Sequence, residues 1–432
     1  MKHFFYNIMP HFSDNAARIF SNLFRAFKNR NYRLFFFGHG VSLIGTWMQQ
    51  VALSWYVYRI TGSPFLLGFT AFMNHIPSFF LTPVSGVLAD RFDRHKLLLL
   101  TQSCSMIQAF SLTYAVHNFN GEVWRVILLT FTLGVINSFD APIRQAFVLD
   151  MLDRKEDLSN AIALNSAIFN SARLIGPAIA GITVHMFGET PCFLFNAMSY
   201  AAVITSLLLM KIKPREILNK NPDIIANIKE GFRYAAGFPP IRMIIQLVGL
   251  TSFTTISYNV LMPVFARDIL KGSADTLGYL MGAVGCGALA GISYIASRKS
   301  VTGLERVAAF NVAILGASLM LFSQSRSFAF SLVFMFTTGV GMISCMAACN
   351  TMLQTLSDDD KRGRVMSIYT MALIGMAPFG SLISGFCSKH IGAPATLFFC
   401  GLFCLAAARS FSSKLPVFRE FAAPVYEKKG IK

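Results

Sequence analysis

Long apolar stretches alternate with short polar ones along the whole chain. Each apolar stretch is about 20 residues long, enough to cross a hydrocarbon core of ~30 Å as a helix that rises ~1.5 Å per residue. Charged residues, Pro/Gly positions and polar clusters bound these stretches and predict twelve spans. The spans cover residues 34–58, 65–89, 97–117, 123–143, 161–187, 191–211, 241–266, 276–297, 306–324, 328–352, 365–388 and 393–413. The pattern therefore predicts an all-α membrane protein.

A polar segment between spans six and seven divides the chain into two groups of six spans. Two similar segments, LSNAIALNSAIFNSARLIGPAIAG and GRVMSIYTMALIGMAPFGSLISG, begin spans five and eleven after charged loops. We interpret them as a duplicated six-helix unit, which gives two pseudo-symmetric bundles with a site between them, as in secondary transporters. The predicted parts are an N-terminal tail (1–33), a first bundle (34–212), a linker (213–240), a second bundle (241–413) and a C-terminal tail (414–432).

Composition and charge agree with a membrane location. The 432 residues are 54% hydrophobic and 14% charged, whereas about a quarter of the residues are charged in soluble domains. The net charge of +17 is a topological signal, because most Lys and Arg residues fall on one side of the predicted spans. The outer loops carry only Arg59, Arg125, Arg267, Lys271, Arg326 and Lys389. The positive-inside rule then places both termini in the cytoplasm.

The densest cluster of charges is GVLADRFDRHK, residues 86–96, between spans two and three. It resembles the signature between helices two and three of the major facilitator superfamily, although Asp93 and His95 depart from the common pattern. The resemblance implies a cytoplasmic gate that is closed in one state and broken in the other. A solvated loop would explain the basic residues but not Gly86 and Asp90. The matching residues are Gly86, Asp90, Arg91, Arg94 and Lys96.

A second motif, RLIGPAIAG, lies in span five. Pro177 removes a backbone hydrogen bond and bends the helix, while Gly176 and Gly181 permit close packing. The motif, which begins at Arg173, resembles the antiporter motif of facilitator-superfamily exporters and implies export. An ordinary packing kink is the alternative.

FDAPIRQAFVLDML (139–152), TWMQQVALSWYVYRITGSPFLLG in the first two spans and the span-five segment resemble one branch of this superfamily. That branch contains the enterobactin exporter and related efflux proteins. The resemblance implies a transporter of the bacterial inner membrane that exports a siderophore-like or drug-like compound in exchange for protons. Alternatives are a multidrug or macrolide exporter, a lysophospholipid flippase, and a non-transporting scaffold or sensor.

Three ionisable residues inside the spans are candidates for proton coupling. Asp140 needs a partner because a charge in lipid costs about 2.5–3.5 kcal/mol. Pairing with Arg94, or with Arg144 one helical turn away, would make it part of the gate; the alternative is a proton carrier. His39 and His75 can titrate near physiological pH, or can serve as hydrogen-bonded neighbours.

Other polar residues in the spans are candidates for the substrate cavity. Arg173 is a lone basic residue in a span and could bind an anionic or catecholate substrate, or be satisfied by a backbone carbonyl. Polar side chains in spans face the protein interior or a wet cavity, and some will be contacts between helices. The remaining cavity candidates are Trp47, Gln49, Gln50, Tyr56, Asn74, Asn165, Asn170, Tyr258, Asn259 and Asn350.

Several activities lack a supporting motif. There is no GxxxxGK[ST] phosphate loop, nucleophile elbow or HExxH sequence, so we expect neither an ATPase nor an enzyme. The eight cysteines show no metal-ligand spacing, and we expect no metal and no cofactor. The N-terminal tail could form an amphipathic helix on the inner leaflet or remain a flexible tail. We expect a monomer whose partners are a small-molecule substrate, protons and membrane lipids, with no nucleic acid.

Overall fold

The computed structural model describes residues 25–119, 121–212, 224–298, 300–358 and 361–430. The first half contains η1 (Arg25–Lys28), α2 (Arg30–Thr61), α3 (Pro64–Arg91), α4 (Arg94–Asn118), α5 (Val123–Phe147), η2 (Val148–Met151), η3 (Lys155–Asp157), α6 (Leu158–Phe187) and α7 (Thr190–Leu208). The second half contains α8 (Ile224–Gly237), α9 (Pro239–Val264), the π-helix η4 (Phe265–Ile269), α10 (Ala274–Ser297), α11 (Leu304–Gln324), α12 (Phe328–Leu356), α13 (Arg362–Gly375), α14 (Ala377–Ile391), α15 (Ala393–Ser413) and α16 (Leu415–Lys428).

The all-α membrane class predicted from the sequence is confirmed. Within the described residues, 10 helical segments are long and apolar enough to cross a membrane, and α13 and α14 together form one of them. The predicted spans 34–58 and 97–117 coincide with α2 and α4, which are 32 and 25 residues long. These two helices carry more polar side chains than the others, so the number twelve stays a prediction. The N-terminal amphipathic helix, if present, falls largely outside the described residues.

The sequence encodes the turns between helices by cap residues. Gly62 adopts a left-handed conformation (φ 58°) that ends α2, and the Ser63 hydroxyl accepts a hydrogen bond from the backbone of Leu66 at the start of α3. Pro64 occupies the first turn of α3, where it costs no hydrogen bond. Asp93 caps α4 by accepting from the backbone of His95 and Lys96. The departure from the family pattern at Asp93 therefore has a local structural use.

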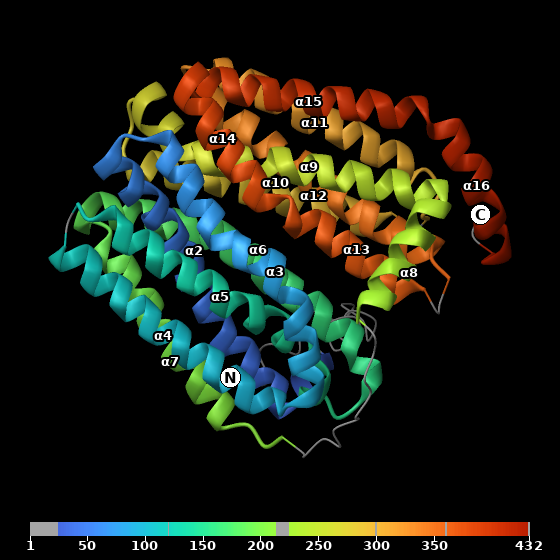
Figure 1. Ribbon diagram of the computed structural model, residues 1–432, viewed down its shortest axis with the longest axis horizontal. Coiled ribbons are helices and arrows are strands. Elements are labelled where there is room, and N and C mark those ends of the chain that lie inside the picture. Colours follow the sequence, from blue (N-terminus) through green and yellow to red (C-terminus); the bar gives the residue numbers. More distant parts are fainter. Residues whose placement is uncertain (1–24, 120, 213–223, 299, 359–360, 431–432) are drawn as a thin grey trace, which may run out of the picture.

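The two halves lie next to each other, and in the view of Figure 1 the first half is below the second. We call the end of the bundle that holds α8 and α16 the inner end, following the predicted orientation, and the opposite end the outer end. Within the first half α2 packs on α6 and α7, and α3 packs on α5; within the second, α10 packs on α12, and α11 packs on α12 and α15. The halves meet along two seams, α6 with α10 and α3 with α14.

Each seam contains a pair of facing glycines. A Cβ on Gly181 would lie 3.0 Å from the Cα of Gly278 and 2.8 Å from the carbonyl oxygen at the first residue of α10. A Cβ on Gly385 would lie 2.9 Å from the Cα of Gly68 and 2.8 Å from the carbonyl oxygen at the first residue of α3. The same geometry recurs at both seams, and it gives a physical reason for the glycines that end the span-five and span-eleven segments.

Under the transporter function that the sequence resemblance implies, Gly68→Ala should lower transport at least tenfold. The added Cβ would lie 2.4 Å from the backbone oxygen of Ser381, so α3 and α14 would have to move apart at the outer end. Transport assays in proteoliposomes at matched protein amounts measure the effect. The control is Gly249→Ala, whose Cβ meets only the Ala372 side chain at an ordinary 3.9 Å. Equal activity of the two variants would contradict the importance of the seam.

The C-terminal region, predicted only as a tail, contains a further helix. α16 buries Phe418, Ala422 and Tyr426, which stand four residues apart on one helical face. Arg419 Nε lies 2.9 Å from the carboxylate of Glu305, a buried residue at the start of α11. The i, i+4 spacing of the three apolar residues is the signal that could have predicted this helix.

Candidate functional site

Arg173 lies midway along α6, between the two halves. Its Nη2 is 3.4 Å from the Tyr258 hydroxyl on α9 and 3.7 Å from the Met342 sulfur on α12. Its guanidinium carbon is 5.8 Å from the centre of the Trp47 ring on α2, and that ring packs edge-on against Phe169. Helices from both halves therefore supply an aromatic and thioether surround for one cation.

No carboxylate contacts Arg173 within the part of the chain that the structure describes. The Tyr258 oxygen and the Met342 sulfur satisfy only part of a guanidinium that carries five N–H donors. An arginine at this depth that has no counter-ion is a ready binding group for a carboxylate or another oxyanion. The sequence leaves two alternatives for Arg173, an anionic substrate or a backbone carbonyl. Among the described residues, no backbone carbonyl accepts a hydrogen bond from Arg173.

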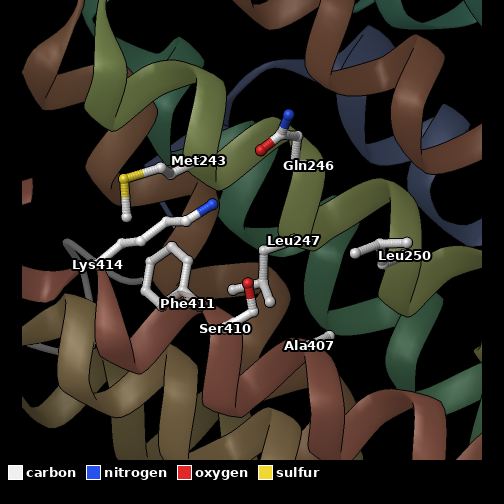
Figure 2. Close-up of a pocket in the computed structure, with 8 residues that line it drawn as sticks. All are labelled: Met243, Gln246, Leu247, Leu250, Ala407, Ser410, Phe411 and Lys414. Atoms are coloured by element: carbon white, nitrogen blue, oxygen red, sulfur yellow. The ribbon is translucent and has the colours of Figure 1, made fainter.

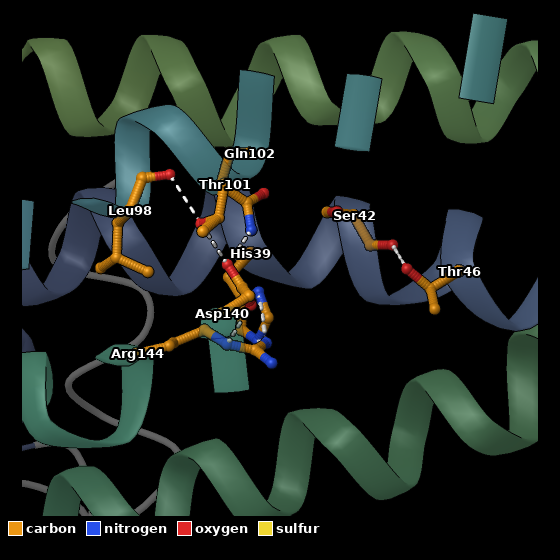
Figure 3. A network of polar contacts seen from close by, with 8 residues as sticks. All are labelled: His39, Ser42, Thr46, Leu98, Thr101, Gln102, Asp140 and Arg144. Carbon is orange, nitrogen blue, oxygen red and sulfur yellow. Dashed lines mark hydrogen bonds and ion pairs between the residues drawn. The ribbon is translucent and has the colours of Figure 1, made fainter. Parts of the chain in front are cut away.

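A polar cluster lies nearer the inner end of the first half, on α2, α4 and α5 (Figure 3). Asp140 is 4% exposed and its Oδ1 accepts from the Thr101 hydroxyl at 2.9 Å and from the Gln102 amide at 2.7 Å. Its Oδ2 is 3.2 Å from Nε of Arg144. Three side-chain donors therefore surround this carboxylate. Of the two partners considered for Asp140, the structure pairs it with Arg144 and not with Arg94.

Arg144 links this carboxylate to a histidine. Its Nη1 lies 2.7 Å from Nε2 of His39, and Figure 3 shows the guanidinium between Asp140 and the imidazole. The His39 ring stacks on Phe35, with centroids 5.0 Å apart. Because arginine can only donate, His39 must be neutral and unprotonated at Nε2 for this contact to form. His75, on α3, makes no hydrogen bond in the described residues.

The motif at residues 86–96, which the sequence predicts to be a gate, is described only in part. The surroundings of Gly86 and the side chain of Asp90 are not among the described features, so their predicted roles stay predictions. Arg94 is buried, and its Nη1 lies 3.2 Å from the carbonyl oxygen of Ala146 and 3.5 Å from the carboxylate of Asp150. It thereby joins the start of α4 to the end of α5 within one half. Arg91 and Lys96 are exposed at the inner end.

A set of contacts that we name the outer latch joins the halves at the outer end. The Tyr58 hydroxyl at the end of α2 donates to the carboxylate of Asp268 in η4. Arg267 donates to the backbone oxygen of Tyr58 at 3.2 Å, and the His185 ring on α6 lies 2.8 Å from the Ser273 hydroxyl. Arg267 was expected only as an outer-loop residue, without these partners. A charged Arg-Asp pair in loops that carry few charges is the signal that could have identified it.

The other cavity candidates are spread over different environments. Asn196 donates to the Gln49 side chain at 2.8 Å and ties α7 to α2. Asn165 accepts from the Tyr32 hydroxyl at 3.0 Å, and Asn170 donates to the backbone of its own helix. Only Trp47 and Tyr258 are placed beside Arg173. The remaining residues stay candidates for the substrate cavity. Tyr56 is buried, Gln50 is exposed, and Asn74, Asn259 and Asn350 are partly buried.

A separate cavity lies on a different face of α6. It has a volume of about 510 Å³ and lies between α6, α10 and α12, with walls that include Leu174, Gly282 and Phe336. Leu174 and Ala178 lie on the side of α6 that leads to the exposed Ile175 and Ile179, away from Arg173. The residues that line this cavity carry no charge, and it is not the site that we consider.

The linker helix α8 is fixed to the second half at the inner end. Its Glu230 accepts from Lys361 Nζ and from Arg364 Nη1, each at 2.6 Å, and Tyr234 donates to Asp358 at 2.9 Å. The hydrogen bond from Lys361, together with the charge of Arg364, lowers the pKa of Glu230 below its ordinary value of 4.5. These contacts attach α8 to α13 of the second half.

The attachment of α8 is expected to weaken only in acid. Because the pKa of Glu230 is lowered in the folded state, its contribution is complete above pH 4.5 and is lost as the pH falls through the lowered value. Amide-hydrogen protection factors of α8 between pH 7 and pH 3 measure this. In Glu230→Gln the same protection should be weak at every pH, and an unchanged acid transition in that variant would assign the effect to another group.

Comparison with known proteins supports a transporter fold and family. Among solved structures, a mutant form of the nucleoside transporter NupG superposes with a TM-score of 0.72 at 10% identity, covering 89% of this chain and 99% of that one. A bacterial homologue of the iron transporter ferroportin in an inward-facing state gives a TM-score of 0.67 at 14% identity, covering 88% and 98%. These likenesses show the fold alone.

Sequence relatives include several bacterial transporters. The staphyloferrin A transporter of Staphylococcus aureus is 26% identical over 388 residues, covering 86% of this chain and 92% of the relative. The multidrug efflux pump Tap of Mycolicibacterium fortuitum is 21% identical over 363 residues, covering 82% and 88%. Macrolide efflux protein A of Streptococcus pyogenes is 23% identical over 254 residues, covering 57% and 62%.

The family model described as transmembrane secretion effector matches residues 21–427, nearly the full chain. The protein therefore belongs to this transmembrane secretion effector family of major facilitator superfamily transporters.

Proposed function

We propose that the protein exports a small, siderophore-like organic anion across the inner membrane in exchange for protons. The observation that carries the proposal is Arg173, a mid-membrane cation between the halves whose described partners are Tyr258, Met342 and Trp47 and include no carboxylate. An anionic group would supply the missing counter-charge, while the aromatic rings would pack on its organic body. The similarity to the staphyloferrin A transporter agrees with a siderophore-like substrate.

Alternating access is the mechanism that fits the described contacts between the halves. The outer latch and the two glycine seams lie at the outer end, so this conformation corresponds to a state closed there. Arg173 would receive substrate from the inner side. Breaking the latch and closing the inner end, with the motif at residues 86–96 as gate, would then expose the site outward.

Proton coupling is assigned to the cluster of Asp140, Arg144 and His39. Protonation of His39 removes the acceptor that Arg144 uses and places two cations in contact. Arg144 would then have to move, which offers a route from protonation to a change in how α2 and α5 pack. Asp140 would hold the arginine throughout as its counter-ion.

A cellular and a biochemical measurement together test the function. Loss of the gene should leave an anionic compound inside the cells that wild-type cells release, found by comparing spent medium with cell extracts under iron-replete and iron-starved growth. Purified protein in proteoliposomes should move that compound when a pH gradient is imposed. Identical metabolite profiles in both growth conditions would remove the siderophore version.

Efflux of neutral or cationic drugs is the second candidate. The relatives named macrolide efflux protein A and multidrug efflux pump Tap favour it. It is distinguished by the charge of the compound transported, because a cationic drug gains nothing from Arg173. A lysophospholipid flippase and a non-transporting scaffold or sensor remain alternatives, and a transport assay with a soluble anion separates both from the main proposal.

A further inference from the structure

A groove between α9 and α15 opens at the inner end of the second half, on the outside of the bundle. The residues that line it are drawn in Figure 2. They are Met243, Gln246, Leu247 and Leu250 on α9, Ala407, Ser410 and Phe411 on α15, and Lys414, which follows α15. The groove has a volume of about 60 Å³, more than the ~10–15 Å³ that a single water needs.

The end of this groove nearest the inner surface is polar and basic. Lys414, the residue that follows α15, extends over Phe411 toward α9, and the amide of Gln246 lies on the opposite wall (Figure 2). Ser410 stands one helical turn before Lys414, and Arg242 stands one turn before Gln246, so both helices present polar groups at the same level. Lys414 forms no ion pair with any acid among the described residues.

The rest of the groove is apolar and continues toward the middle of the membrane. Leu247 and Leu250 lie about 12–17 Å along α9 from its inner end, at ~1.5 Å per residue. Ala407 faces them from α15. At this depth the surrounding solvent is hydrocarbon, so an apolar floor that opens outward meets acyl chains and not water.

We propose that this groove binds an anionic phospholipid of the inner leaflet. Its phosphate would contact Lys414, Gln246 and Ser410, and one acyl chain would lie along Leu247, Leu250 and Ala407. The order of the groove, basic at the surface and apolar below, matches the order of a phospholipid. Basic pockets between transmembrane helices on the cytoplasmic side are recognised binding places for such head groups. A soluble anion would use the basic end only.

The groove is also connected, through α9, to the Arg173 site and to the outer latch. α9 carries Tyr258 beside Arg173 and leads into η4, which holds Arg267 and Asp268 of the outer latch. α15 continues through Lys414 into α16, which contacts α9 and α12. A lipid in the groove would therefore touch the helix that links both regions.

The test measures lipid binding by the full-length purified protein in detergent micelles. Native mass spectrometry with phosphatidylglycerol and phosphatidylcholine should show preferential retention of phosphatidylglycerol. Lys414→Gln should weaken phosphatidylglycerol binding about fivefold, the effect of one basic residue at a membrane surface. The matched control is Lys211→Gln, which removes an exposed lysine from the predicted inner side of the first half. Thermal unfolding of each variant verifies that it is folded.

Three results would overturn the proposal. Equal binding of the two lipids by the wild-type protein would show that no anionic head group is recognised. An equal loss in Lys211→Gln would show that general surface charge causes the preference. Displacement of phosphatidylglycerol by millimolar inorganic phosphate would assign the polar end to a free anion. None of these results depends on the exported substrate, so the proposal can fail while the transport function stands.

Discussion

Arg173→Gln is expected to lower transport of an anionic substrate about a hundredfold. A charge-assisted hydrogen bond contributes up to about 3 kcal/mol, which is a factor of roughly 100 or more in affinity. Glutamine retains hydrogen-bonding ability and similar length but removes the positive charge. The apparent substrate affinity, measured in proteoliposomes over a range of substrate concentrations, should therefore fall more than the maximal rate.

Arg173→Lys is the matched control for charge. It keeps the cation but loses the planar donors that address a carboxylate and the stacking on Trp47, so we expect an intermediate loss of about tenfold. Cationic or neutral compounds should be moved equally well by all three proteins. If Arg173→Gln transported the anion normally, Arg173 would be a packing residue, and the anionic-substrate proposal would be wrong.

The charge of the site can be predicted from the sequence, but its surroundings cannot. Arg173 stands out because a basic residue inside an apolar span is costly. Tyr258 and Met342 are 85 and 169 residues away, and no local pattern connects them to α6. Pairings of this kind depend on how the two halves dock, which hydrophobic periodicity does not determine.

Turns formed by residues close together in the sequence can be predicted from it. Contacts between residues far apart in the sequence cannot. Ser63 with Pro64 and the αL position of Gly62 are local signals, so the turn between α2 and α3 is readable from the sequence. The contact between Tyr58 and Asp268 joins residues 210 positions apart, both near helix ends that face an outer loop. This contact depends on the conformation that the protein adopts, and in the proposed alternating-access mechanism it would be present in one state and absent in the other.

The cluster around Asp140 can be predicted from the sequence only in part. The pairing with Arg144 follows from their i, i+4 spacing and is one of the two alternatives predicted from the sequence. Thr101 and Gln102, which donate to Asp140, lie on α4, and His39, which accepts from Arg144, lies on α2; no sequence pattern pairs these residues with the ion pair. The need of a buried carboxylate for donors can be predicted, whereas the identity of those donors requires the fold.

His39→Gln is expected to remove proton-driven export while leaving downhill movement of substrate. Glutamine offers Arg144 a neutral oxygen acceptor in place of the imidazole nitrogen, so the contact can persist, but it cannot be protonated. In the wild-type protein a protonated His39 would face Arg144, and two like charges about 4 Å apart repel by on the order of 4 kcal/mol at an effective dielectric constant of ~20. That repulsion is the free energy that would couple protonation to movement of α2 against α5.

Two assays on the same proteoliposomes separate coupling from binding. Uphill transport driven by an imposed pH gradient should fall at least tenfold in His39→Gln, whereas exchange of substrate across the membrane at equal pH should remain within about twofold of the wild-type rate. The control is His75→Gln, since His75 forms no hydrogen bond in the described part of the chain, and both activities should persist.

Loss of exchange in His39→Gln would make His39 a structural acceptor for Arg144. Retention of uphill transport would instead place the coupling proton on another group, and Asp140→Asn would then be the next variant to measure, because an amide in place of this carboxylate cannot take up the proton.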